Sequence, residues 1–354
     1  KPLATQTDVV FKLDPADTLT LSRTQYYWVK AQLAGDLKAG TPISVSAKSV
    51  TAGGTKYDVT QEKPFDTKTR EGGLQGTLRV GSSSAATYKS LAAAAKDLTK
   101  QGVSGAVTVE VEPGEYPETV LLESVPGASA KNSITIVGLG NSRDEVVISA
   151  NGYNKPTGPN AYREYYGVMT VRNTPYVTLR NMTIHSTDLG FPTMVYVQEN
   201  SSHFTMDNCY VYTKNTSNAN YNMSPHLVKI EAASNPHAQS CDVLVENSLF
   251  EGGHIALQIG GTSTVANPVG KGYTVRNNRF VDHSGKAIYV IRSSEVLIEG
   301  NEMVQQITPQ REYIGIDATF HTDAKVIGND FDLTQPEAYK LSSLHGISVR
   351  SVLG

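Results

Sequence analysis

The sequence predicts an all-β fold in which short strands wind into a parallel β-helix, and three observations lead to this prediction. A string of the form apolar-x-apolar-x-Asn/Gly-x-x-apolar occurs six times between residues 177 and 331. Apolar and polar residues alternate within the strings, as in half-buried strands. The fifth position is always Asn or Gly, which tolerate the left-handed backbone of a sharp corner. These corner residues, offset by 27, 39, 30, 23 and 28 positions, are Asn181, Asn208, Asn247, Asn277, Gly300 and Gly328.

A second alternating string accompanies the corners along the chain. It occupies residues 169–172, 195–198, 228–231, 257–260, 288–291, 314–317 and 347–350. Two or more strands per coil, each stacked on its equivalent one coil away, make a single-stranded parallel β-helix, and stacked corner Asn side chains predict a hydrogen-bonded ladder. The alternative is a β-sandwich with evenly spaced turns, but a sandwich gives no reason to repeat one corner residue.

The chain is expected to have two parts. Residues 1–78 contain alternating segments at 18–33, 41–50 and 55–60, which predict a small N-terminal β-rich module of antiparallel strands. Residues 79–354 form the β-helix, and the Ala-rich segment 91–100 is its short capping helix. An open β-helix end exposes strand edges, so we expect a partner, a further segment or a folded-back piece of chain to cover the C-terminal end.

Composition narrows the function classes. The net charge of the 354 residues is −3 and no basic run occurs, so nucleic acid is not an expected partner. No apolar stretch approaches the roughly 18 residues that a membrane span needs. The predicted fold and the abundant Asn, Thr, Ser and Tyr residues lead us to expect a secreted or cell-surface protein.

The outward residues of the second string form two expected columns along the helix axis. The first contains Thr170, Tyr196, Lys229, Gln258, Tyr289, Gly315 and Ser348, and the second contains Arg172, Gln198, Glu231, Gly260, Ile291, Asp317 and Arg350. Neighbouring coils lie about 4.8 Å apart, so these columns form a ribbon that suits an extended polysaccharide. Aromatic faces would stack on sugar rings while amides and charges reach hydroxyls or carboxylates. The expected glycan contacts are Gln198, Gln258, Tyr289 and Asp317, with Tyr165 and Tyr221 from the long segments 151–167 and 211–226.

Lyase chemistry is the sharpest catalytic hypothesis. It needs a base that removes a proton beside a uronate carboxylate and a cation that stabilises the resulting charge. Lys229, Tyr196, Glu231 and Arg172 could supply base, acid and clamp on neighbouring coils. A two-carboxylate glycosidase is not expected, because Glu231 and Asp317 would lie three coils, or about 14 Å, apart instead of the roughly 5–9.5 Å required.

The segment VTVEVEPGEY at 107–116, which follows the Ala-rich segment, resembles the pectin-lyase-like superfamily of right-handed parallel β-helices. The resemblance covers residues 79–354 and implies right-handed winding. Pectin methylesterases of this superfamily have an Asp-Phe-Ile-Phe-Gly strand that would fall on 256–260, where Ala256 replaces the catalytic aspartate, so that esterase activity is not expected. The Arg-x-Pro-x-x-Arg strand of calcium-dependent pectate lyases is absent, as is a Glu-x-Glu motif on the ribbon strands.

The cofactor prediction is that no transition metal binds, because the eight histidines show no metal-ligand spacing. A carboxylate-rich loop could still hold calcium. Two functions follow from the sequence: a protein that acts on or recognises an extended polysaccharide, with lyase activity as one form, or a non-catalytic adhesin or structural stalk that binds glycan or a cell surface.

Overall fold

A computed structural model describes most of the chain. The described residues are 42–45, 49–52, 55–58, 65–69, 72–150, 167–186, 193–214, 225–231, 240–260, 270–306, 312–334 and 343–351. The contacts divide the chain into two units, residues 1–72 and 73–354.

The N-terminal unit contains two antiparallel strand pairs. Strand β1 (Pro42–Val45) pairs with β4 (Phe65–Thr69), and β2 (Ser49–Ala52) pairs with β3 (Thr55–Asp58). The β-rich character predicted for this part is therefore confirmed. The strand predicted at 18–33 lies outside the described residues.

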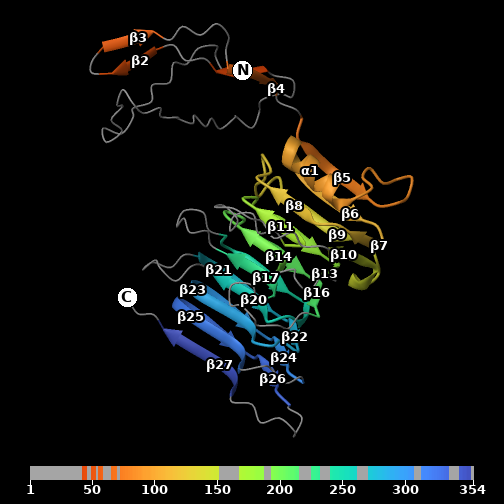
Figure 1. The fold of residues 1–354 in the computed structure, drawn as a ribbon, viewed down its shortest axis with the longest axis vertical. Helices are drawn as coiled ribbons and strands as arrows, with labels where there is room; N and C mark the ends of the chain where they lie inside the picture. The colour runs from red at the N-terminus through yellow and green to blue at the C-terminus, as the bar shows by residue number, and fades with distance from the viewer. Residues whose placement is uncertain are drawn as a thin grey trace. The chain divides into compact units, whose positions relative to one another are not determined.

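The second unit is a parallel β-helix whose coils follow one another from β5 to β27 (Figure 1). Every strand pair among its described residues is parallel, and the strands make three faces. Face A consists of β8 (Val120–Glu123), β11 (Met169–Arg172), β14 (Thr193–Gln198), β17 (His226–Glu231), β20 (Ile255–Gly260), β27 (Ser343–Ser351) and the first parts of the long strands β23 (Lys286–Glu299) and β25 (Glu312–Ile327).

Faces B and C complete each coil. Face B consists of β5 (Leu74–Val80), β6 (Val103–Val111), β9 (Ile134–Gly138), β12 (Val177–Arg180), β15 (Thr205–Asp207), β18 (Val243–Glu246), β21 (Gly270–Arg276) and the second parts of β23 and β25. Face C consists of β7 (Gly114–Pro117), β10 (Val146–Ala150), β13 (Thr183–Ser186), β16 (Tyr210–Thr213), β19 (Leu249–Gly252), β22 (Arg279–Val281), β24 (Glu302–Val304) and β26 (Asp330–Asp332). A short 3-10 turn, Arg143–Glu145, precedes β10.

The interior is filled by stacks of equivalent apolar side chains. On face A the stack Val195, Val228, Leu257, Ile288 and Ile316 is in register from coil to coil, and all five are fully buried. Burying one such side chain contributes about 1.5–3 kcal/mol. The alternation read from the sequence thus places one set of residues in the core and the other on the outer side.

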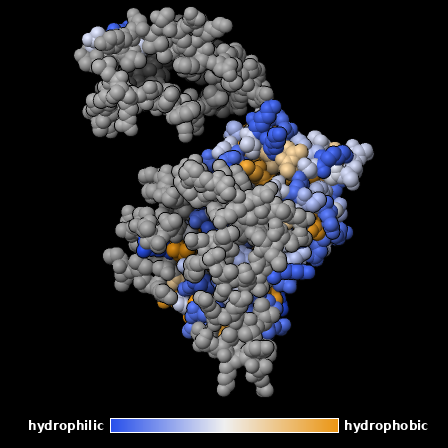
Figure 2. Space-filling view, in the orientation of Figure 1, coloured by the Kyte–Doolittle hydropathy of each residue, from blue (hydrophilic) through white to orange (hydrophobic). Residues whose placement is uncertain are grey.

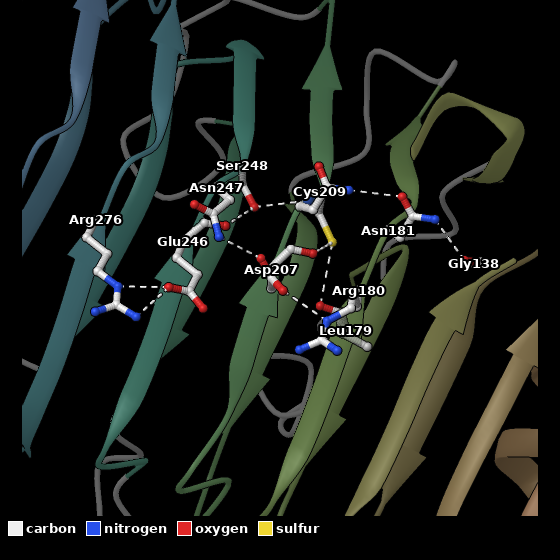
Figure 3. A network of polar contacts seen from close by, with 11 residues as sticks. Gly138, Leu179, Arg180, Asn181, Asp207, Cys209, Glu246, Asn247, Ser248 and Arg276 are labelled. Carbon is white, nitrogen blue, oxygen red and sulfur yellow. Dashed lines mark hydrogen bonds and ion pairs between the residues drawn. The ribbon is translucent and has the colours of Figure 1, made fainter. Parts of the chain in front are cut away.

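The corners between faces B and C have the predicted left-handed backbone. Asn181, Asn208, Asn247 and Asn277 have φ between 50° and 54°, and Gly300 and Gly328 have φ of 61°. Asn208 Nδ2 donates to Asn181 Oδ1 at 3.0 Å, so the predicted Asn ladder is confirmed there. Asn247 instead donates to the Asp207 carboxylate at 2.9 Å (Figure 3).

Helix α1 (Leu91–Gln101) packs its buried side chains against β5, β6 and β8. Its start is fixed by Ser90, whose Oγ accepts from Ala93 N at 3.1 Å, and by the Glu118 carboxylate, which accepts from Leu91 N and Ala92 N. These oxygens satisfy N–H groups that have no partner within the helix. The capping helix predicted at 91–100 is therefore confirmed.

Candidate functional site

The outward residues of face A form one column that crosses successive strands. Tyr196, Lys229, Gln258, Tyr289 and Asp317 are direct neighbours on β14, β17, β20, β23 and β25. Four strand spacings of about 4.8 Å give the column a length of about 19 Å. Tyr196 and Asp317 are 6% exposed and Gln198 is 8% exposed, so parts of this ribbon are buried.

The register corrects two sequence assignments on β25, because Gly315 does not lie beside Tyr289 as the first column predicts. Asp317 pairs with Tyr289 and therefore belongs to the Lys229 column, not to the Glu231 column. The error arose because Ile314, Ile316 and Ala318 all face inward, so a pattern of period two fits both frames. The separation between Glu231 and Asp317 still spans three strands, at least about 14 Å, which remains too long for a two-carboxylate glycosidase.

Three of the predicted catalytic residues meet in what we call the first polar cluster: Tyr196, Lys229 and Glu231. The Tyr196 hydroxyl donates to Glu231 Oε2, and Lys229 Nζ lies 3.4 Å from the same oxygen. Lys229 Nζ also lies 5.4 Å from the centre of the Tyr196 ring. One carboxylate oxygen therefore joins a phenol and an ammonium from adjacent coils.

The protonation of Tyr196 limits the chemistry of this cluster. Burial, reinforced by the negative charge of Glu231, raises the pKa of Tyr196 well above its ordinary value. The phenol therefore stays protonated near neutral pH and acts as a hydrogen-bond donor. The raised pKa makes this phenol a weak acid, and in its protonated form it cannot serve as a base.

Arg172, the predicted clamp, forms an ion pair outside this cluster, although its charge acts on Tyr196. Its Nε lies 2.8 Å from Glu123 Oε1, on the neighbouring coil away from Glu231. Arg172 and Glu231 share a column but are separated by the strand that carries Gln198. The guanidinium is thus engaged by a partner that the sequence did not identify.

A second polar cluster lies farther along the column and consists of Lys286, Tyr289 and Asp317. Lys286 Nζ forms an ion pair with Asp317 Oδ2 and lies 3.8 Å from the centre of the Tyr289 ring. The side chains of Lys286 and Asp317 are only 16% and 9% exposed. The sequence did not single out Lys286 as a site residue, because it stands before the first alternating position of its strand.

Two histidines, His226 and His254, contact polar side chains of the next coil. His226 Nε2 is 2.8 Å from Gln258 Oε1, and His254 Nδ1 is 3.0 Å from Ser284 Oγ. Burial, together with the charge of Lys286, lowers the pKa of His254, so that its ring is neutral near pH 7. The sequence pattern was tested only for metal-ligand spacing of the histidines. In the structure, each of these two histidines instead has a polar neighbour on the next coil.

Two of the predicted glycan contacts, Tyr165 and Tyr221, lie outside the described residues. Within the described part of the chain, no group of three His, Cys, Asp or Glu side chains is placed to hold a metal ion. None of the described segments forms a helix with the length and apolarity to cross a bilayer. Hydrophilic residues dominate the described surface on the side drawn in Figure 2.

Comparison with known proteins identifies the fold. No family model matches the chain, and no curated protein matches it. Among solved structures, a lacto-N-biosidase from Eubacterium ramulus has a TM-score of 0.54 at 14% identity over 80% of this chain. Only 56% of that enzyme is covered, so this chain spans just over half of its length.

Two other similar structures have lower TM-scores. A rice weevil pectin methyl esterase has a TM-score of 0.42 and 12% identity over 74% of this chain and 86% of its own. An alginate lyase from Paenibacillus has a TM-score of 0.38 and 12% identity over 77% of this chain and 98% of its own. The parallel three-faced coil and the likeness to the lacto-N-biosidase structure agree in fold: the chain is a parallel β-helix, as the sequence predicts.

Proposed function

We propose that this protein recognises an extended polysaccharide along the outer side of face A. The observation that carries the proposal is the in-register column of Tyr196, Lys229, Gln258, Tyr289 and Asp317 across five successive strands. A linear ligand with repeated hydroxyl groups matches a row of amide, phenol and charged groups spaced at about 4.8 Å. The fold shared with a lacto-N-biosidase, a protein named for acting on a carbohydrate, is consistent with a glycan ligand. A secreted or cell-surface location is part of this proposal.

Lyase action on a uronate polymer is the second candidate, favoured by the contact of Tyr196, Lys229 and Glu231. Glu231 would take the proton from the carbon beside the uronate carboxylate, and a carbon–carbon double bond would form as the glycosidic C–O bond breaks. Tyr196 would protonate the leaving oxygen, while Lys229 offsets the charge on the uronate. A proton returning along the Tyr196–Glu231 hydrogen bond would restore both groups.

The raised pKa of Tyr196 counts against this second candidate. A phenol that is buried beside a carboxylate loses its proton at a high free-energy cost, because the phenolate would be desolvated and would face a like charge. Recognition requires no such step, and the same groups serve it as donors and acceptors. We therefore favour glycan recognition over glycan cleavage as the function of face A.

The test is affinity electrophoresis against a panel of polyuronates and neutral polysaccharides, with ultraviolet absorbance of unsaturated products followed in parallel. Lys229→Ala should weaken retention of the preferred glycan at least tenfold. Lys131→Ala, which removes an exposed lysine between β8 and β9, is the matched control and should leave retention unchanged.

The outcomes separate the candidates. Retention without product release supports recognition, and product release that Lys229→Ala abolishes supports a lyase. If no polysaccharide in the panel is retained or cleaved, the proposal is overturned, and a structural stalk becomes the better account. Equal retention of wild type and Lys229→Ala would remove face A as the site.

A further inference from the structure

Face C carries a hollow that has no part in the column of face A. It lies over β16, β19 and the end of β22, and its volume is about 450 Å³. Small-molecule sites commonly measure about 300–1,000 Å³ and combine aromatic walls with a few polar groups. This hollow has both kinds of lining.

Its aromatic wall is held in place by stacking. The Tyr212 ring lies 4.5 Å from the ring of His185 and 4.8 Å from the ring of Tyr210, with interplanar angles of 13° and 25°. Tyr212 and Tyr210 both border the hollow, whereas His185 supports Tyr212 from the neighbouring coil. The rings are therefore fixed before any ligand arrives, which lowers the entropic cost of stacking on them.

The polar wall is predominantly acidic. Glu251 and Asp282 border the hollow, and Lys214 is the cation among the described residues that line it. The Tyr210 hydroxyl donates to Glu251 Oε2 at 2.6 Å and fixes this carboxylate at the rim. Asp282 accepts from Gln306 N at 2.7 Å through Oδ1.

Charges from neighbouring coils add to this acidity. Glu115 acts on Tyr212 and His185, and Asp144 acts on Tyr210. Burial lowers the pKa of His185, so its ring is uncharged near neutral pH and adds no cation. An anionic ligand would meet several like charges here, whereas sugar hydroxyls can donate to carboxylates in charge-assisted hydrogen bonds.

We infer that the hollow bordered by Tyr210, Tyr212, Glu251 and Asp282 is a second carbohydrate site, which takes an uncharged sugar residue. The sugar's C–H face stacks on the tyrosine wall and its hydroxyls donate to the carboxylates. The site is independent of face A, because β16, β19 and β22 belong to a different sheet.

The experiment measures retention on a panel of neutral polysaccharides, a β-glucan, a xylan, a mannan and a galactan, with one polyuronate for comparison. All proteins carry Lys229→Ala, so that face A does not dominate the signal. Tyr212→Ala in this background should weaken retention on at least one neutral polysaccharide tenfold or more. Glu251→Gln, which keeps an acceptor for Tyr210 but removes the charge, should weaken it several-fold.

Three results would overturn the inference. One is the absence of retention on every neutral polysaccharide in the Lys229→Ala background. Another is unchanged retention in both Tyr212→Ala and Glu251→Gln, even if Tyr212→Ala lowers the melting temperature, because the rings would then be only a structural stack. A loss confined to the polyuronate would assign the wrong ligand class. Face A is tested separately, since its failure appears as equal retention of wild type and Lys229→Ala.

Discussion

His283 is a buried histidine whose proton uptake is coupled to folding. The ring is fully buried, its Nδ1 contacts the Gly252 carbonyl oxygen, and burial lowers its pKa from 6.5 to about 4. Between these two values the unfolded chain binds a proton that the folded chain does not bind. The free energy of unfolding therefore falls as pH decreases from 6.5 towards 4.

The first prediction concerns this pH window. The shift corresponds to a contribution of up to about 3 kcal/mol that is present above pH 6.5 and lost towards pH 4. His283→Gln should lose about 2–3 kcal/mol less stability than wild type between pH 7 and pH 4.5, measured by urea unfolding. Other titrating groups, including His185 and His254, are present in both proteins and cancel. Equal losses in the two proteins would contradict the assigned pKa.

Individual site residues show which contacts the sequence predicts and which it does not. Tyr196, Lys229 and Glu231 could be placed together, because alternation fixes their side of the strand and the corner spacing fixes their coil. Asp317 was assigned to the wrong column, because alternation leaves a shift of two residues undetermined. Lys286 stands before the alternating positions of its strand, and its ion pair with Asp317 depends on that register, so the sequence does not identify it as a site residue.

At the scale of elements, the corners between faces B and C contain a second ladder that the sequence did not reveal. It is formed by the residue after each corner: Met182, Cys209, Ser248, Asn278, Asn301 and Asn329. Cys209 N donates to Ser248 Oγ and Ser248 N donates to Asn278 Oδ1, each at 3.0 Å. The position holds Met, Cys and Ser in the first three coils and Asn only in the last three, so the sequence marks it in part, whereas the corner position keeps Asn or Gly because its backbone is left-handed.

The second prediction tests this inner ladder at Asn301, which is 1% exposed. Its Oδ1 accepts from Asn278 N and Nδ2, and its Nδ2 donates to the Val275 carbonyl at 2.9 Å. Asn301→Ala leaves these buried groups without their partner. The free energy of unfolding should fall by about 2–5 kcal/mol in urea denaturation, because each orphaned group costs about 1–3 kcal/mol.

The matched control is Glu302→Ala in the same coil. Glu302 pairs with Arg279 at 2.6 Å, but both side chains are about half exposed, at 41% and 51%. Such surface pairs contribute less than about 1 kcal/mol. Comparable losses of unfolding free energy in the two variants would mean that the inner ladder does not stabilise the corner.

In the β-helix as a whole, the coils stack at a regular spacing, so residues that are far apart in the sequence lie at regular distances along the helix axis. Residues 229 and 289 are far apart in the chain, yet only β20 separates their strands, so the two polar clusters lie about 10 Å apart at their nearest point. The outer limits, Tyr196 and Asp317, span about 19 Å. A ligand on face A therefore meets one cluster or both, depending on its length.

The third prediction follows from this spacing. A short oligosaccharide bridges only one cluster, so its affinity should respond to either Lys229→Ala or Tyr289→Ala but not to both. A long one engages both clusters, and because its second contact is intramolecular, its affinity should exceed that of the short one by roughly 10²-fold. Isothermal titration calorimetry across a series of increasing chain length gives the measurement, with Lys131→Ala as the neutral control. Affinity that does not change with length, or equal weakening of the shortest ligand by both variants, would show that the clusters do not act as two anchors for one chain.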